Sequence, residues 1–312
     1  MTRKYLKHLV LFFLAVSVIV GAADESPVDT DNSKGYDEAD YEKIGHIGSG
    51  SYGIVSKIQE KKTGKIYALK TQKKEGCSHA TKEINALKQL DHENIVKMIT
   101  NNTKNRHKGD FLCIVLEYIP FSLYYIVENK KHDKEIKENR KRIFFQILKG
   151  IAHIHGKKLT HGDLKPRNIL IDLGTMSVKI CDFGICIDFN KEKYSKEKFA
   201  ENCRKDILCF GSLITYVYNE MYYLECFNKK ECDDFEDIFK TGIYSEENYV
   251  GKVYRKMKSA SKTWTEFLKD LFMIEEKSVA AAEALKHPFF DEVRELDTSM
   301  KQGERNNFLA EN

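Results

Sequence analysis

Residues 161–168 read His-Gly-Asp-Leu-Lys-Pro-Arg-Asn, and the interpretation of the whole chain depends on them. An acid, a lysine and an amide, Asp163, Lys165 and Asn168, follow one another at short spacing within this stretch. Fourteen residues after Asn168 comes Asp182, in the tripeptide Asp-Phe-Gly. Residues 178–180 just before it alternate between apolar and polar, which predicts a short strand. Two polar motifs at this spacing indicate a functional site more strongly than either motif alone.

These motifs resemble the catalytic core of eukaryotic protein kinases, which reads H-R-D-L-x-x-x-N and is followed by D-F-G. The resemblance implies that Asp163 accepts the proton of a substrate hydroxyl, and that Asn168 and Asp182 hold Mg²⁺ against the phosphates of ATP. Lys165 matches the D-L-K-P-x-N pattern of serine/threonine kinases, in which the lysine reaches the transferred phosphate. A protein substrate with a Ser or Thr acceptor is therefore expected. The alternative is that both motifs are chance tripeptides on surface turns, which their spacing disfavours.

A glycine-rich stretch precedes this core and matches the kinase pattern G-x-G-x-x-G-x-V. The residues after its third glycine alternate in polarity and predict a strand, whereas a dinucleotide-binding turn would continue into a helix. The resemblance implies a loop whose backbone closes over the phosphates of ATP. The residues assigned to nucleotide binding in this loop are Ile47, Gly48, Ser49, Gly50, Ser51, Tyr52, Gly53 and Val55.

Two further charged residues fit the same family pattern. Residues 67–70 predict a strand that resembles V-A-I-K, so Lys70 is expected to contact the α- and β-phosphates. Residues 80–90 have the apolar spacing of a helix, and Glu83 resembles the helix glutamate that pairs with the strand lysine. The alternative for Glu83 is one of several exposed helix acids.

The end of the smaller lobe is expected near an apolar run. Residues 94–97 predict the start of a strand, residues 100–110 a polar loop, and residues 111–118 a buried strand. In kinases the last of these strands runs into the hinge. The resemblance therefore implies that Glu117 and Ile119 offer backbone groups to adenine.

Beyond residue 118 the apolar period changes from two to nearly four. Residues 143–154 predict a long helix with one apolar face. Residues 206–212 resemble the start of a kinase helix whose Asp206 braces the catalytic loop, and residues 282–290 resemble the closing helix. The resemblance to protein kinases therefore implies an α+β fold of two lobes over residues 41–290. A small antiparallel β-sheet lobe with one helix spans residues 41–118, and a larger, mainly helical lobe spans residues 119–290.

The two ends of the chain differ from this core. Residues 1–23 have a basic start, a short apolar run and small residues, which is typical of a secretory signal peptide. The protein is therefore expected in the secretory pathway or outside the cell, with a membrane-tethering signal anchor as the alternative. Residues 24–40 predict a disordered linker, and residues 291–312 a polar tail. The chain has eight cysteines. Cys113 and Cys181 lie in predicted strands and are expected as buried free thiols. Only Cys226 with Cys232 and Cys203 with Cys209 are candidates for disulfides.

Composition and departures from the family pattern limit the expected function. The formal net charge is only +4, with 31% charged residues, so nucleic acid is not the expected partner. Gly162 replaces the arginine of H-R-D, and the segment from Gly184 to Asp206 is short and lacks A-P-E. This predicts a kinase that phosphorylation of its activation segment does not control. The alternative is a pseudokinase scaffold that binds nucleotide or a partner protein without turnover.

Overall fold

The structure is a computed structural model. Its chain divides into two compact units, Met1–Lys34 and Gly35–Asn312, and all described residues belong to the second. The predicted signal peptide therefore lies outside the described residues. The described residues are 35–50, 53–73, 78–103, 111–190, 194–219, 229–260, 262–273 and 281–297.

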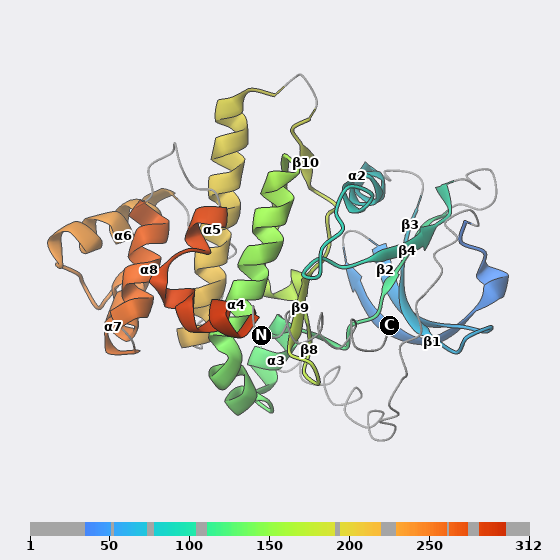
Figure 1. The fold of residues 1–312 in the computed structure, drawn as a ribbon, viewed down its shortest axis with the longest axis horizontal. Helices are drawn as coiled ribbons and strands as arrows, with labels where there is room; N and C mark the ends of the chain where they lie inside the picture. The colour runs from blue at the N-terminus through green and yellow to red at the C-terminus, as the bar shows by residue number, and fades with distance from the viewer. Residues whose placement is uncertain are drawn as a thin grey trace. The chain divides into compact units, whose positions relative to one another are not determined.

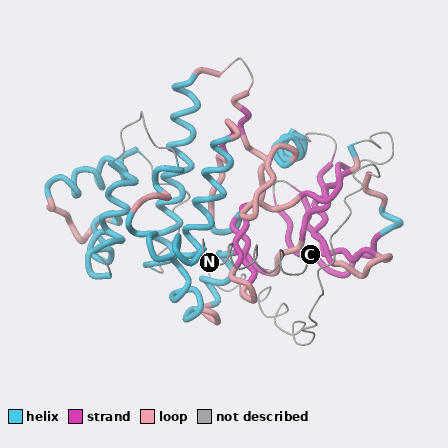
Figure 2. Tube along the Cα trace, viewed as in Figure 1, coloured by secondary structure: helices cyan, strands magenta, loops and turns pink. Residues whose placement is uncertain are grey.

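A five-stranded antiparallel sheet forms one part of the described unit (Figures 1 and 2). The strand order is β1-β2-β3-β5-β4, so β1 and β4 are the edges. Cys113 and Val115 of β5 pack into a small cluster with Ile58 and Tyr67. The residues that alternate with them, Leu112, Ile114 and Leu116, belong to the main core. Burial on both faces explains the continuous apolar run. The strands are β1 (Tyr41–Gly50), β2 (Gly53–Glu60), β3 (Ile66–Lys73), β4 (Met98–Asn101) and β5 (Phe111–Glu117).

The segment between β3 and β5 departs from expectation. Helix α2 (Ser78–Leu87) ends three residues early, although Leu90 is still buried. The strand expected at residues 94–97 is wrong, because β4 begins only at Met98. Residues 94–96 instead bond to the strand before Asp182. The amide of Val96 donates to the carbonyl of Ile180 at 2.9 Å, and the amide of Ile180 donates to the carbonyl of Asn94 at 2.9 Å. This tertiary pairing attaches the smaller lobe to the larger one.

Helices form most of the second part of the unit (Figure 2). The predicted apolar face of residues 143–154 is buried on α4, and α5 packs against it. Gly150 lets α4 approach β9 closely, since a Cβ there would lie 2.8 Å from Ile180 Cδ1. The helices are α3 (Leu123–Asn129), α4 (Asp133–Gly156), α5 (Lys196–Asn219), α6 (Lys229–Thr241), α7 (Tyr249–Ala260), α8 (Lys262–Met273) and α9 (Ala281–Ala284).

Five short strands frame the 161–168 loop. One sheet contains β6 (Phe121–Ser122), β8 (Ile169–Asp172) and β9 (Ser177–Ile180), and a two-stranded ribbon pairs β7 (Leu159–Thr160) with β10 (Ile187–Asp188). The loop itself ends in a 3-10 turn, η3 (Pro166–Asn168). The residues on either side of the loop are thereby fixed by strand pairing. None of the described helices has the length and apolar character needed to cross a membrane.

Both ends of the folded part extend further than predicted. Residues 35–40, expected in the disordered linker, contain the 3-10 turn η1 (Glu38–Asp40). The amide of Tyr36 donates to the carbonyl of Asn101 at 3.0 Å. Residues 291–297, expected in the polar tail, are helical, and Val293 is buried. Lys149 on α4 pairs with Asp297 at 3.1 Å. These tertiary contacts order both segments despite their polar composition.

The suggested Cys203–Cys209 disulfide is wrong, because Cys203 is a free thiol. Both residues lie on α5, where a separation of six residues corresponds to about 9 Å along the axis. That distance exceeds what a disulfide can span. The prediction for Cys226 and Cys232 lies outside the described residues.

Candidate active site

The 161–168 loop is held from below by a buried carboxylate on α5. Asp206 Oδ2 accepts the amide of His161 at 2.8 Å, and its Oδ1 accepts the amide of Gly162 at 2.9 Å. His155, at the end of α4, contacts Asp206 Oδ2 at 3.0 Å. Burial by itself would raise the pKa of Asp206, but the hydrogen bond and charge of His155 outweigh it and lower that pKa. The carboxylate therefore stays charged and fixes the start of the loop, as the sequence predicted.

His161 connects this loop to the residues before Asp182. Its Nδ1 accepts the amide of Asp163 at 3.1 Å, and its Nε2 contacts the carbonyl of Cys181 at 3.0 Å. A carbonyl can only accept, so Nε2 carries the proton in this arrangement. The ring also packs on Phe183, with the centroids 4.9 Å apart. The sequence interpretation gave His155 and His161 no structural role, although both are buried parts of the site.

One carboxylate oxygen of Asp163 is held by neighbouring side chains, and the other is not. Its Oδ2 pairs with Lys165 Nζ at 2.6 Å and accepts Asn168 Nδ2 at 3.1 Å. Its Oδ1 accepts no hydrogen bond from a described residue. The side chains of Asp163 and Lys165 are 23% and 28% exposed. One carboxylate oxygen can thus face a ligand while the other holds its neighbours in place.

A second charged cluster joins the two lobes through Lys70 on β3. Lys70 Nζ lies 2.5 Å from Glu83 Oε2 on α2 and 2.8 Å from Asp182 Oδ1. Lys70 is 8% exposed and Glu83 is fully buried. Asp182 has a φ of +66°, a conformation that costs a non-glycine residue about 1–2 kcal/mol. The expected pairing of Lys70 with Glu83 is present, and Asp182 joins it at the cost of local backbone strain.

The charges of this cluster stabilise one another. Burial alone lowers the pKa of Lys70, but the charges and hydrogen bonds of Glu83 and Asp182 outweigh it and raise that pKa. Burial raises the pKa of Glu83, against the opposing charge of Lys70. For Asp182 the ion pair with Lys70 outweighs burial and lowers the pKa. The raised pKa keeps Lys70 cationic at neutral pH.

The glycine-rich loop forms the turn between β1 and β2. Gly53 has a φ of +116°, and a Cβ there would lie 2.2 Å from the carbonyl oxygen of Thr71, so only glycine fits. Cβ atoms at Gly48 and Gly50 would meet open space, so the backbone of this turn is accessible. Ile47 is exposed, Ser49 is exposed and Val55 is half-buried. Ser51 and Tyr52, at the tip, lie outside the described residues.

The predicted hinge shows an unpredicted side-chain role. Glu117 Oε1 accepts the amide of Lys97 at 2.6 Å and pairs with Lys179 Nζ at 2.8 Å. Glu117 was expected to act through its backbone, but its side chain connects β5 to β9. The backbone of Ile119 makes no hydrogen bond within the described residues. The alternating pattern of residues 178–180 was the only sequence signal for Lys179, and it predicts a solvated side chain.

The chain after Gly184 is short and closely packed. Ile187 pairs with Thr160, and the amide of Phe189 donates to the carbonyl of Lys158 at 2.9 Å. Helix α5 then begins at Lys196, whereas a start near Asp206 was expected. The reason is local, because Ser195 Oγ accepts the amide of Lys198 at 3.2 Å and caps the helix. Asp206 consequently lies in the middle of α5.

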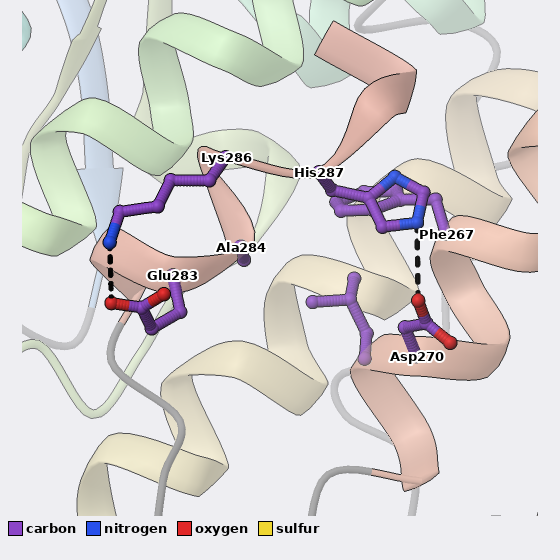
Figure 3. Close-up of a pocket in the computed structure, with 7 residues that line it drawn as sticks. Phe267, Asp270, Glu283, Ala284, Lys286 and His287 are labelled. Atoms are coloured by element: carbon purple, nitrogen blue, oxygen red, sulfur yellow. Dashed lines mark hydrogen bonds and ion pairs between the residues drawn. The ribbon is translucent and has the colours of Figure 1, made fainter.

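A separate cavity of about 420 Å³ lies between α8 and the turn after α9 (Figure 3). Phe267 lines it, and four of its polar lining residues form two pairs. Asp270 contacts His287 at 3.2 Å, and Glu283 contacts Lys286 at 2.8 Å (Figure 3). None of the residues assigned from the sequence lines this cavity.

Comparison with known protein families agrees with this geometry. A family model described as protein kinase domain matches residues 41–290. The match covers the glycine-rich turn, both charged clusters and the helices that support them. Its bounds coincide with those of the two-lobed fold expected from the sequence.

Proposed function

This chain belongs to the protein kinase family, and from that premise we propose that it transfers the γ-phosphate of ATP to Ser or Thr hydroxyls of proteins with the help of Mg²⁺. The most direct support is that Lys70 contacts both Glu83 and Asp182, at 2.5 and 2.8 Å. For turnover, kinases need the ion pair between this lysine and the helix glutamate, and they need the D-F-G aspartate in place at the same time. A scaffold that neither binds nucleotide nor turns it over has no chemical need for either.

The residues present fit a magnesium-bound nucleotide. Asn168 uses its Nδ2 on Asp163, and Asp182 uses its Oδ1 on Lys70. The remaining oxygens, Asn168 Oδ1 and Asp182 Oδ2, make no hydrogen bond within the described residues. Mg²⁺ is usually held by one or two protein oxygens together with water and substrate phosphates. When bound there, Mg²⁺ would neutralise phosphate charge and orient the γ-phosphate.

Asp163 is the proposed base for the acceptor hydroxyl. Its Oδ1 takes the hydroxyl proton as the hydroxyl oxygen forms a bond to the γ-phosphorus. The bond from that phosphorus to the bridging oxygen breaks, and the electron pair leaves with ADP. Lys165 stands beside Asp163, where its charge can stabilise the transferred phosphoryl group. The charge of Lys70 can stabilise the α- and β-phosphates in the same way.

The preference for Ser and Thr rests on Lys165, which follows Asp163 by two residues as in serine/threonine kinases. The proposal of control without phosphorylation rests on Gly162. Its φ of +80° suits glycine and strains an arginine. With glycine at this position there is no arginine side chain whose positive charge a phosphate would have to neutralise.

Secretory targeting is a further part of the proposal, supported by residues 1–23 alone. N-terminal sequencing of secreted protein should find a start at Ala23 or Asp24. An intact Met1 in secreted material would reject cleavage, and protein confined to the cytosol would reject targeting.

Transfer of labelled phosphate from ATP and Mg²⁺ to a generic basic protein tests the central proposal. The full chain should label Ser and Thr, and the Asp163→Asn variant should not. Magnesium-dependent ATP binding without transfer would favour the pseudokinase alternative. That alternative has one observation behind it, because the short segment before α5 leaves little chain to seat a peptide.

A further inference from the structure

The first turn of α2 is capped by a side chain of another element, the strand β3. Helix α2 begins at Ser78, and the first four amides of a helix have no acceptor within it. Usually a side chain directly before the helix supplies one. Here the amide of Ala80 donates to Oε1 of Gln72 at 3.0 Å, and Gln72 lies eight residues earlier, on β3. The strand therefore holds the start of the helix directly.

Gln72 and Lys70 attach one side of α2 to one face of the sheet. They are two residues apart on β3, so their side chains lie on the same face. Their partners, Ala80 and Glu83, are three residues apart and are neighbours on the helix surface. Lys70 contacts Glu83 at 2.5 Å. The helix is thus fixed to β3 at two points, and one of them is the buried ion pair of the candidate active site.

The capped turn also packs against the D-F-G tripeptide. A Cβ at Gly184 would lie 3.4 Å from the Cβ of His79, the second residue of α2. Ala80, next to His79, is only 3% exposed. A shift of this turn would therefore displace Glu83, which lies one turn further along α2, and would disturb the residues that follow Asp182.

The side chain of Gln72 makes this contact and no other hydrogen bond within the described residues. Residues 74–77, between β3 and α2, lie outside that part of the chain. Without Oε1 of Gln72 the buried amide of Ala80 would lose its acceptor, and a buried donor without a partner is unfavourable. An outward shift of α2 would expose this amide to water, and Glu83 would move with it.

We propose that Gln72 is a positioning residue that holds α2, and with it Glu83, in the place required for phosphotransfer. This rests on the proposed function, in which Lys70 must be paired with Glu83. Gln72 acts through the backbone of Ala80 and not on the reacting groups. Loss of its side-chain oxygen favours an arrangement of α2 in which Lys70 no longer contacts Glu83.

Steady-state kinetics of the full chain test this with two variants at Gln72. Gln72→Met keeps the approximate size of the side chain and removes the acceptor, whereas Gln72→Glu keeps an acceptor oxygen. Gln72→Met should lower kcat about tenfold and raise KM for ATP about fivefold, and Gln72→Glu should stay within about threefold of wild type in both. A loss of folded protein would lower kcat alone, so the change in KM reports the position of α2.

Gln59→Met is the matched control. Gln59 Nε2 donates to the carbonyl of Gly64 at 2.8 Å in the exposed turn between β2 and β3. This variant loses a glutamine hydrogen bond of the smaller lobe without touching α2. It should leave kcat and KM for ATP unchanged.

Hydrogen exchange gives a readout that does not depend on transfer. In Gln72→Met the amides of α2 should exchange at least about tenfold faster, relative to those of α4, than in wild type. Unchanged exchange in α2, or wild-type kinetics in Gln72→Met, overturns this inference. Equal losses in Gln72→Glu and Gln72→Met also overturn it, because the acceptor oxygen would not be the cause. Absence of transfer by wild-type protein overturns the proposed function, and the exchange experiment then decides by itself whether Gln72 positions α2.

Discussion

The structure contains two lysine–carboxylate pairs of almost the same length in different surroundings. Lys70 and Glu83 are 2.5 Å apart, and Lys165 and Asp163 are 2.6 Å apart. The first pair is enclosed, with Glu83 fully buried, whereas both members of the second are about a quarter exposed. Distance alone would rank the pairs as equals.

Burial makes the two pairs differ in kind. A buried charge that loses its partner has no water to replace it, so the first pair is rigid and its loss is costly. Solvent screens the second pair, which can separate when a ligand arrives. We infer that the nucleotide side of the site is preformed and that the acceptor side adjusts to its substrate.

The largest expected effect is on phosphotransfer, and nucleotide binding should distinguish the two sides of the site. Asp182→Asn should abolish magnesium-dependent phosphotransfer, by at least a thousandfold or about 4 kcal/mol of barrier, and should also weaken binding of ATP with Mg²⁺. A neutral amide cannot balance phosphate charge as a carboxylate does. Asp163→Asn should abolish transfer and leave nucleotide affinity nearly intact. Calorimetric titration and labelled-phosphate transfer measure the two quantities.

Asp172→Asn, at the end of β8, is a matched control for this prediction and should leave transfer within about twofold. Turnover retained by Asp182→Asn would overturn the metal assignment. Equal losses of nucleotide affinity in both active-site variants would erase the distinction between the two sides.

The next effect concerns stability. Lys70→Met leaves Glu83 buried without a partner and should lower the free energy of unfolding by about 3–5 kcal/mol at pH 7. Lys165→Met should cost less than about 1 kcal/mol, since water replaces the lysine. Without Lys70 the pKa of Glu83 rises further, so this variant should recover stability relative to wild type as the pH falls and Glu83 gains a proton. Urea denaturation at several pH values measures this.

A double variant sharpens the comparison. Adding Glu83→Gln to Lys70→Met removes the buried charge and should restore part of the lost stability. If Lys70→Met and Lys165→Met cost the same, burial does not distinguish the pairs.

Much of the candidate site could be predicted because its chemistry fixes residue types at fixed spacing. Lys70, Glu83, Asp163, Asn168 and Asp182 were all named from motifs, and the structure brings them into two adjoining clusters. The resemblance of the same motifs to protein kinases likewise implied the two-lobed fold, and the period of the apolar residues predicted individual strands and helices within it. These signals are local, so one sequence is sufficient to detect them.

The remaining features depend on contacts between distant segments. Glu117 and Lys179 pair across sixty-two positions of the chain, and each alone reads as a solvated charge. Tyr36 lies in a polar stretch but stacks on Tyr41, with the centroids 5.5 Å apart. The early start of α5 follows from the cap at Ser195, which resembles many other serines. Composition cannot reveal such tertiary effects.

A smaller effect on stability is expected at Asp206, which holds the 161–168 loop on the acceptor side of the site. Asp206→Asn should lower the free energy of unfolding by about 2–3 kcal/mol at pH 7, because charge-assisted hydrogen bonds to the 161–168 loop are lost. The folded-state pKa of Asp206 is lowered, so its contribution is present above the ordinary aspartate pKa and is lost as the pH falls through the folded value. The difference between wild type and variant should therefore shrink below about pH 4. A constant difference down to pH 2 would contradict this.

The smallest effect concerns the short segment between Gly184 and α5. Tyr194 and Ser195 are its notable hydroxyl residues, and both already have structural contacts. The Tyr194 ring packs on Phe189 at 4.9 Å, a contact that phenylalanine would keep. Ser195→Ala removes the helix cap and should cost about 1 kcal/mol of stability.

With Gly162 in place of an arginine, neither hydroxyl needs a phosphate to complete the site. Phosphatase treatment, or Tyr194→Phe with Ser195→Ala, should therefore change the transfer rate by less than about tenfold, or 1.4 kcal/mol of barrier. A hundredfold loss on dephosphorylation would show that another basic residue, with Arg204 the nearest candidate, binds a phosphate. The acceptor side would then depend on a modification, and its adjustability would not be a property of the unmodified fold.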